Sequence, residues 1–229
     1  MGYAKDLDKS LNNIQIVTGK NSEEMARFAE QANKAAKALS TTTTKYTDAS
    51  LIYFQQGLDG DEVTKRADIT VKMANVTGQS AETVSDQMTA VWNNFYDGSK
   101  SLEHYADVMT ALGAATASSS EEIAGGLEKF AAIGDTIGLS FEYAASALAT
   151  ITSNTRQSEE VVGTALKTIF ARIQGLELGE TLEDGTDLNK YSQALASVGV
   201  SIKDSAGELK NMDTILDEMA AKWGTLNKD

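Results

Sequence analysis

The sequence contains no cysteine and no proline among its 229 residues, and aromatic residues make up only 7% of it. Without cysteine the chain has no disulfide framework, no thiol nucleophile and no thiolate metal ligand. Without proline it lacks the residue that breaks helices most strongly, which favours a chain built almost wholly of helices. Because aromatic residues are few, the core must consist of Ala, Leu, Ile, Val and Met, and small side chains at helix contacts let backbones approach closely.

Positive charge and long apolar runs are also scarce. Lys and Arg number 20 against 33 Asp and Glu, which gives a formal net charge of −13 and opposes binding to nucleic-acid phosphates or anionic lipid. The hydrophobic content of 41% and the mean hydropathy of −0.26 are typical of soluble globular proteins. No run approaches the ~18 apolar residues of a membrane-spanning helix. The segment from Met1 to Asp6 has no apolar signal core, so nothing there favours secretion.

Two helices are predicted at the start of the chain. The first stops at Gly19 and carries on one face Tyr3, Leu7, Leu11 and Ile14. The second opens at residues 22–24, and its apolar face consists of Met25, Phe28, Ala29, Ala32, Ala36 and Leu39. Four consecutive threonines between Ser40 and Lys45 then interrupt the pattern, since β-branched residues are poor helix formers. This polar segment is either a domain boundary or a helix–helix loop within one domain.

A repeated pattern begins at Asp59. A capping residue is followed by an acid two positions later and by small or apolar residues at the fourth and eighth positions, and the capping residues are Asp59, Ser80, Ser101, Ser119, Ser140 and Ser158. Such a cap accepts a backbone N–H, the acid meets the positive end of the helix dipole, and the two later positions share one face. The pattern therefore predicts helices joined by short connections. It describes either a true structural repeat or a series of ordinary capped amphipathic helices.

The apolar faces of these helices predict the core. One stripe is Val84, Met88, Val91, Trp92 and Phe95, and the next is Leu102, Tyr105, Met109 and Leu112. The widest stripe predicts that its helix is the most central one, and it consists of Val161, Val162, Ala165, Leu166, Ile169, Phe170 and Ile173. Replacing Leu166 or Phe170 with alanine would then cost several kcal/mol, in line with the ~2–5 kcal/mol typical of buried side chains.

The pattern weakens after Gly175. Residues 176–187 are predicted to form a surface loop, and a helix from Asp187 to Gly199 follows. The alternation near residues 199–210 fits a small β-hairpin. A last helix begins near Asp213, and its buried side is predicted to be Ile215, Leu216, Met219, Trp223 and Leu226. The fold class is all-α, either a multi-helix bundle or stacked antiparallel helical hairpins. The predicted parts are N-terminal helices over 1–44, which could extend away from the core, a helical core over 45–175, and a C-terminal part over 176–229 packed on it.

Catalytic and metal-binding patterns are missing from the sequence. The single histidine, His104, has no nucleophile motif beside it and is predicted to be structural. The pair Gly125-Gly126 lies within a predicted helix, where it marks either a kink or, as we favour, a close helix contact. The acid clusters at 59–62 and 183–187 lack the ligand order of a calcium loop and fit ordinary turns and caps. The sequence thus predicts no catalytic residue, no metal and no cofactor.

Several ordered segments resemble one known family. Residues 152–173, TSNTRQSEEVVGTALKTIFARI, are similar to the core signature of phage tail tape measure proteins from phages and prophages of Gram-positive bacteria. Residues 195–210 and 212–218, the pair Lys222-Trp223, and residues 116–123 and 138–140 agree with it. The resemblance runs from Thr18 to Lys228. The signature positions, all structural, are Arg156, Ser158, Glu159, Gly163, Thr164, Ala165, Leu166, Phe170, Arg172, Gly199, Asp204, Gly207 and Trp223.

The resemblance implies a non-enzymatic structural protein of the virion tail, located in the tube lumen and, during assembly, in the host cytoplasm. Family members set tail length, scaffold tube assembly and leave the tail during DNA ejection. The implied partners are the tail tube protein, tail assembly chaperones and tail tip proteins, with self-association as a further option. Family members are several times longer, so the resemblance implies a fragment. The rival prediction is a helical protein-binding scaffold module of a bacterial cellular protein.

Two hypotheses join the residues to this resemblance. The wide apolar faces and short connections predict a compact folded module, which would have to unfold or rearrange to lie in a narrow tube. The acidic character would keep the module from adhering to DNA as it passes.

Overall fold

A computed structural model describes residues 2–178 and 189–224, which form helices and short connections. Within these residues the helices are α1 (Gly2–Thr18), α2 (Ser22–Ala38), α3 (Thr43–Gln55), α4 (Gly60–Thr77), α5 (Ala81–Phe95), α6 (Leu102–Ala115), α7 (Ser120–Thr136), α8 (Phe141–Thr155), α9 (Glu159–Leu178), α10 (Asn189–Ser197) and α11 (Met212–Trp223). The all-α prediction is confirmed.

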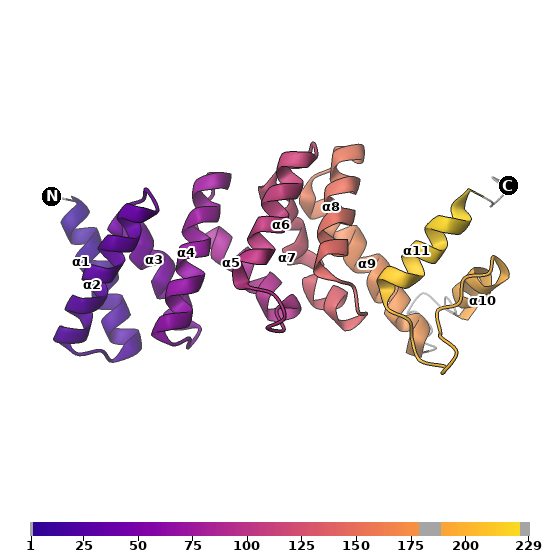
Figure 1. Ribbon diagram of the computed structural model, residues 1–229, viewed down its shortest axis with the longest axis horizontal. Helices are drawn as coiled ribbons and strands as arrows, with labels where there is room; N and C mark the ends of the chain where they lie inside the picture. The colour runs from indigo at the N-terminus through magenta and orange to yellow at the C-terminus, as the bar shows by residue number, and fades with distance from the viewer. Residues whose placement is uncertain (1, 179–188, 225–229) are drawn as a thin grey trace.

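The helices are stacked side by side along the long axis of the molecule, from α1 at one end to α10 and α11 at the other (Figure 1). From α1 to α9, the helices that pack most closely are one or two places apart in the chain. The odd-numbered helices α3, α5, α7 and α9 pack in sequence as one layer, and α4, α6 and α8 pack in sequence as the other. This is the two-layer arrangement of stacked helical hairpins.

The repeat that begins at Asp59 governs this stack. Every predicted cap accepts a backbone N–H through its side chain, as Ser119 does from Glu122 at 3.1 Å and Ser158 from Val161 at 3.4 Å. At every one of the six units the fourth and eighth residues after the cap are buried. The caps of α5, α7 and α9 are spaced 39 residues apart, at Ser80, Ser119 and Ser158. Regular spacing and regular packing together favour the structural repeat over a series of unrelated capped helices.

The threonine run is only partly a loop, which corrects the prediction for residues 40–45. The connection spans residues 39–42, and α3 begins at Thr43. Thr42 caps α3 by accepting the Lys45 N–H at 3.2 Å. Thr43 is buried and its hydroxyl accepts a hydrogen bond of 2.9 Å from the Asn33 amide, so contacts with α2 offset the low helix propensity of threonine. The division of the chain at residue 44 stays a prediction.

The most central helix is α7, and the prediction that α9 holds this place is wrong. The buried residues of α7 lie on several sides of the helix, which packs on α5, α6, α8 and α9, and they are Ile123, Ala124, Gly125, Gly126, Leu127, Phe130, Ala131 and Gly134. The core-facing side of α9 is narrower and includes Val162, Gly163, Leu166 and Phe170. Val161 and Ile169 of the same apolar stripe are 53% and 49% exposed, because one side of α9 faces away from the stack.

The start of α11 packs back on the connection between α7 and α8. The predicted loop after Gly175 starts later, since α9 continues to Leu178, and the acid cluster at 183–187 lies outside the described residues. Instead of a full hairpin, residues 200–210 form a turn with one antiparallel bridge between Lys203 and Leu209. The Met212 N–H then donates to the Ile137 carbonyl at 3.2 Å, and the Ser140 N–H to the Asp213 carboxylate at 3.1 Å. These bonds hold the start of α11 against the connection between α7 and α8.

Candidate functional site

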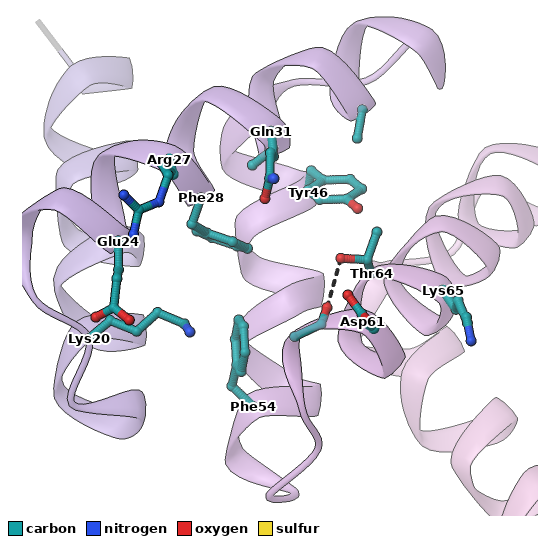
Figure 2. Close-up of a pocket in the computed structure, with 13 residues that line it drawn as sticks. Lys20, Glu24, Arg27, Phe28, Gln31, Tyr46, Phe54, Asp61, Thr64 and Lys65 are labelled. Carbon is teal, nitrogen blue, oxygen red and sulfur yellow. Dashed lines mark hydrogen bonds between the residues drawn. The ribbon is translucent and has the colours of Figure 1, made fainter.

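A groove opens where α2, α3 and the start of α4 meet (Figure 2). Its volume is about 650 Å³. Farther along the stack, α4 packs on α6 and α6 packs on α8, whereas the space between α2 and α4 is this groove. The molecule therefore presents a concave surface near its N-terminal end.

The floor of the groove is aromatic. The rings of Phe28 and Phe54 meet edge to face, with centroids 5.6 Å apart. The Lys20 ammonium lies 5.9 Å from the centroid of the Phe54 ring, which is within reach of a cation–π contact. Burial, together with a 2.8 Å hydrogen bond to the Asp68 carboxylate, raises the pKa of the Tyr46 hydroxyl well above its ordinary value, so Tyr46 stays protonated and cannot act as a base.

The rim of the groove carries charges of both signs with an excess of positive charge. Lys20, Arg27 and Lys65 are the basic residues, and Glu24 and Asp61 are the acidic ones (Figure 2). Glu24 is engaged locally, since its carboxylate accepts the Asn21 N–H at 2.8 Å and completes a capping box. Arg27 is engaged as well, since its guanidinium pairs with the Glu23 carboxylate at 2.6 Å. The groove therefore offers mainly an apolar, aromatic surface. No sequence pattern predicted this groove, although the aromatic residues that follow the threonine run were the available signal.

His104 joins two helices, as its predicted structural role requires. Its Nε2 atom lies 2.6 Å from the Glu142 carboxylate, which links α6 to α8. The His104 ring also meets the rings of Tyr105 and Phe141 edge to face. Burial is the largest single influence and raises the pKa of the Glu142 carboxyl. The hydrogen bonds from His104 and the backbone, together with the charges of His104 and Lys100, lower it by more in sum, so this pKa lies below its ordinary value. No nucleophile contacts this pair within the described residues, so its chemistry is that of an inter-helix link.

The pH dependence of this link has a defined sign. Because the folded-state pKa of Glu142 is depressed, its contribution to stability is complete above pH ~4.5 and is lost as the pH falls through the folded-state pKa. We expect Glu142→Gln to lower the free energy of unfolding at pH 7 by no more than about 1 kcal/mol, because half of the Glu142 side chain is exposed. Urea unfolding of the unmodified protein and of Glu142→Gln should show that the difference between their free energies of unfolding narrows below pH 4.5. Glu82→Gln, at the equivalent position of α5, is the matched control, and a gap independent of pH would contradict the assignment.

Potential metal ligands are scattered over the described part of the chain. No group of three or more potential ligands gathers there, and in the cluster at 59–62 the Asp59 carboxylate accepts the Glu62 N–H at 2.9 Å as a helix cap. Among residues 2–178 and 189–224, no helix has the length and apolarity needed to cross a bilayer.

The glycine pair of α7 marks a close helix contact, as favoured above, and α7 runs through it without a break. A Cβ atom on Gly163 of α9 would lie 2.6 Å from the carbonyl oxygen of Gly126. A Cβ atom on Gly126 would in turn lie 2.5 Å from the Leu148 side chain of α8. Three helices thus meet where only hydrogen atoms fit, which gives a physical reason for glycine at the signature position Gly163.

The other signature positions near α9 have different surroundings. Arg156 ends α8 with a left-handed φ of 58° and donates to the Ala117 carbonyl at 3.1 Å, and Ser158 caps α9. Leu166 and Phe170 are buried, and the Phe170 ring lies 5.7 Å from that of Phe130. Of the remaining signature positions of this helix, Glu159 is partly buried, and the exposed ones are Thr164, Ala165 and Arg172.

The C-terminal signature positions shape a turn rather than a site. Gly199 and Gly207 have φ values of 80° and 86°, in the left-handed region that favours glycine. The Asp204 carboxylate accepts the N–H groups of Ala206 and Glu208 at 2.8 and 3.0 Å. Trp223 corrects the prediction of a buried side for α11, because it is 73% exposed, whereas Ile215 is buried; Leu226 lies outside the described residues. The signature positions therefore lie at a helix contact, in a turn and on the surface, and they do not converge on one cleft.

Comparison with known proteins identifies the family behind this arrangement. The family model described as "Phage-related minor tail protein" matches residues 33–229, which covers α3 to α11 and the last turns of α2. The chain belongs to this phage minor tail protein family. The match includes the complete repeat from Asp59 onward and the crossing of α7 with α9.

A curated relative of this minor tail protein carries a more specific name. The chain is 23% identical over 212 residues to the "Probable tape measure protein" of Escherichia phage P2. The alignment covers 92% of the chain but only 24% of that relative, so the chain spans about a quarter of its length. No solved structure matches the chain.

Proposed function

We propose that this chain is a structural, non-enzymatic module of a phage tail tape measure protein. In this role the longer protein determines tail length, scaffolds assembly of the tail tube and is released during DNA ejection. The observation that carries the proposal is the alignment of nearly the whole chain with a protein named for that role, within the minor tail protein family. The same observation favours a tail protein over a scaffold of a bacterial cell.

The surfaces of the module fit a role in protein contacts. Outside the groove, charged groups such as Glu122 and Glu142 act in a helix cap and an inter-helix link, and the His104–Glu142 pair stands apart from any nucleophile in the part of the chain that the structure describes. The proposed partners are the tail tube protein, tail assembly chaperones and tail tip proteins, with self-association as a further option. The proposed location is the virion tail, reached from the host cytoplasm during assembly. The net charge of −13 supports the proposal that the module adheres only weakly to DNA, because like charges repel.

Deletion of the module from the phage tests the proposal. The codons for residues 1–229 are removed in frame, and with them the helices from α1 to α11. If the module lies stretched as a continuous helix in the tube, at ~1.5 Å per residue, the tails should be shorter by about 340 Å. Electron microscopy of negatively stained virions measures this length.

Three outcomes separate the parts of the proposal. Shortened tails would support a contribution of these residues to the measured length. Loss of tails, with the tube protein left unassembled in lysates, would support the scaffolding role. Virions with tails of normal length and full infectivity would contradict both. The control for length alone replaces the deleted residues, in frame, with 229 residues of a charged helical sequence.

A further inference from the structure

Two hydrogen bonds fasten the start of α11 to the connection between α7 and α8. The chain leaves α10 and turns back toward α9 before α11 begins (Figure 1). There the Met212 N–H donates to the Ile137 carbonyl at 3.2 Å, and the Ser140 N–H donates to the Asp213 carboxylate at 3.1 Å. We call the junction of these two segments the α11 clamp.

Apolar side chains exclude water from the α11 clamp. Met212 and Ile215 are buried on the side of α11, and Ile137 and Leu139 are buried on the side of the connection. A hydrogen bond from which water is excluded is electrostatically stronger than one in water. The packing and the hydrogen bonds of the clamp therefore support each other.

The turn before α11 braces the clamp. The Lys210 N–H donates to the Ile202 carbonyl at 3.0 Å, and the Lys210 ammonium pairs with the Glu218 carboxylate at 2.7 Å. Val200 and Ile202 of the turn are buried as well. The turn and the first half of α11 are thus tied to each other, so the clamp resists a pull as one body rather than one bond at a time.

The α11 clamp joins parts of the chain that are far apart in the sequence. From α1 to α9, the helices that pack most closely are one or two places apart, whereas the clamp joins α11 to the connection that follows α7. Ser140 and Asp213 are 73 residues apart. The clamp therefore closes a loop of the chain that contains α8, α9 and α10.

This closed loop determines which helices bear tension. A pull on the end of α11 reaches the clamp first and crosses it into the connection that leads directly to α7. While the clamp holds, α8, α9 and α10 lie off this path and are not drawn out. At the other end of the stack, α1 packs on α2 and α3, its neighbours in the chain, so tension there acts on one helix after another.

We infer that the α11 clamp is a force-bearing device, which keeps α8, α9 and α10 from being drawn out under tension and releases them in one step when it breaks. The inference goes beyond the proposed function and does not depend on it, since it concerns the response of the folded chain to tension of any origin.

Single-molecule force spectroscopy of the whole chain tests the inference. Because the sequence contains no cysteine, each handle can be attached to one introduced thiol. Handles at Asp6→Cys and Gly224→Cys, both at exposed positions, place the clamp on the path of the tension. The record should contain one step with a gain in contour length of about 250 Å, because 73 residues extend by ~3.3–3.6 Å each.

Two insertions identify the residues that this step releases. About 20 Gly and Ser residues inserted after Gln157, in the exposed connection between α8 and α9, should lengthen the step by roughly 70 Å. The same insertion after Gly98, in the exposed connection between α5 and α6, is the matched control. It lies outside the closed loop and should leave the length of the step unchanged.

Two substitutions identify the clamp as the part that breaks. Met212→Ala should shorten the lifetime of the step at constant force by at least about tenfold, since it leaves a cavity in the clamp. Asp213→Ala, at a partly buried position, removes the acceptor of the Ser140 N–H and should shorten the lifetime as well. Trp223→Ala, farther along α11 and 73% exposed, should leave it unchanged. Circular dichroism should show that all three variants keep the helical content of the unmodified chain.

Two results would overturn the inference. The first is a record in which α8 and α9 are released in separate smaller steps, so that the insertion after Gln157 lengthens one of those instead. The second is a lifetime of the step that neither Met212→Ala nor Asp213→Ala shortens. Both results leave the test by tail length unaffected, so failure of the inference and failure of the proposed function are distinguishable.

Discussion

Replacing Trp92 with alanine is expected to lower the free energy of unfolding by about 4 kcal/mol, within the ~3–5 kcal/mol typical of Trp→Ala and Phe→Ala in cores. Trp92 is 2% exposed, and its Nε1–H donates to the Leu102 carbonyl at 3.1 Å. Its ring lies 4.8 Å from the guanidinium of Arg66, which is itself buried and paired with Glu62 at 2.9 Å. The substitution therefore opens a cavity, removes a hydrogen bond between α5 and α6, and uncovers a buried charge. Urea unfolding followed by circular dichroism measures the loss.

The second tryptophan provides the control for this prediction. Trp223 is 73% exposed, so Trp223→Ala should change the free energy of unfolding by less than about 0.5 kcal/mol. In that variant Trp92 is the single tryptophan, and its emission should be that of a buried indole until the protein unfolds. Equal losses for the two substitutions would show that Trp92 is not at the centre of the stack.

Replacing Gly163 with alanine is expected to destabilise the protein by about 2 kcal/mol, although alanine is the better helix former by ~1 kcal/mol. The added methyl group would lie 2.6 Å from the Gly126 carbonyl oxygen and 3.1 Å from the Lys129 Cβ. Since both contacts involve the backbone or its first side-chain atom, α7 and α9 must move apart. The shift of the urea midpoint measures the cost.

The same substitution at an open glycine separates crowding from helix propensity. A Cβ on Gly60, the first residue of α4, meets no atom within 4 Å, so Gly60→Ala should leave stability unchanged or raise it slightly. If Gly163→Ala behaved like Gly60→Ala, the close crossing of α7 and α9 would be wrong.

Much of this architecture follows from local rules that the sequence displays. A serine or aspartate that caps a helix acts on its own first turn, and residues four and eight positions later share a face, so caps and core positions such as Ser119, Ile123 and Leu127 could be predicted without a structure. The helix α3 was missed because the threonine run opposes helix formation locally, and its stabilising contacts, such as that between Asn33 and Thr43, come from another helix.

Other features depend on which helices become neighbours, and no local rule supplies this. The apolar stripe of α9 predicts burial for Val161 and Ile169 as readily as for Phe170, because hydrophobicity does not reveal which helix ends a layer. His104 and Glu142 are 38 residues apart, and the groove beside Phe28 and Phe54 arises only where α2 and α4 are separated. The fold class was therefore predictable, whereas the surfaces available to partners were not.

The short-range packing of the stack sets how the module would respond to tension. Because the helices from α1 to α9 pack chiefly on neighbours one or two places away, a force applied at the N-terminus would peel off α1, then α2, and so on, instead of rupturing the whole core at once. Refolding would need no disulfide exchange and no prolyl isomerisation, since the sequence has neither cysteine nor proline. A polypeptide of this design can be drawn out from one end as a thread and can re-coil, helix by helix, once the force is released.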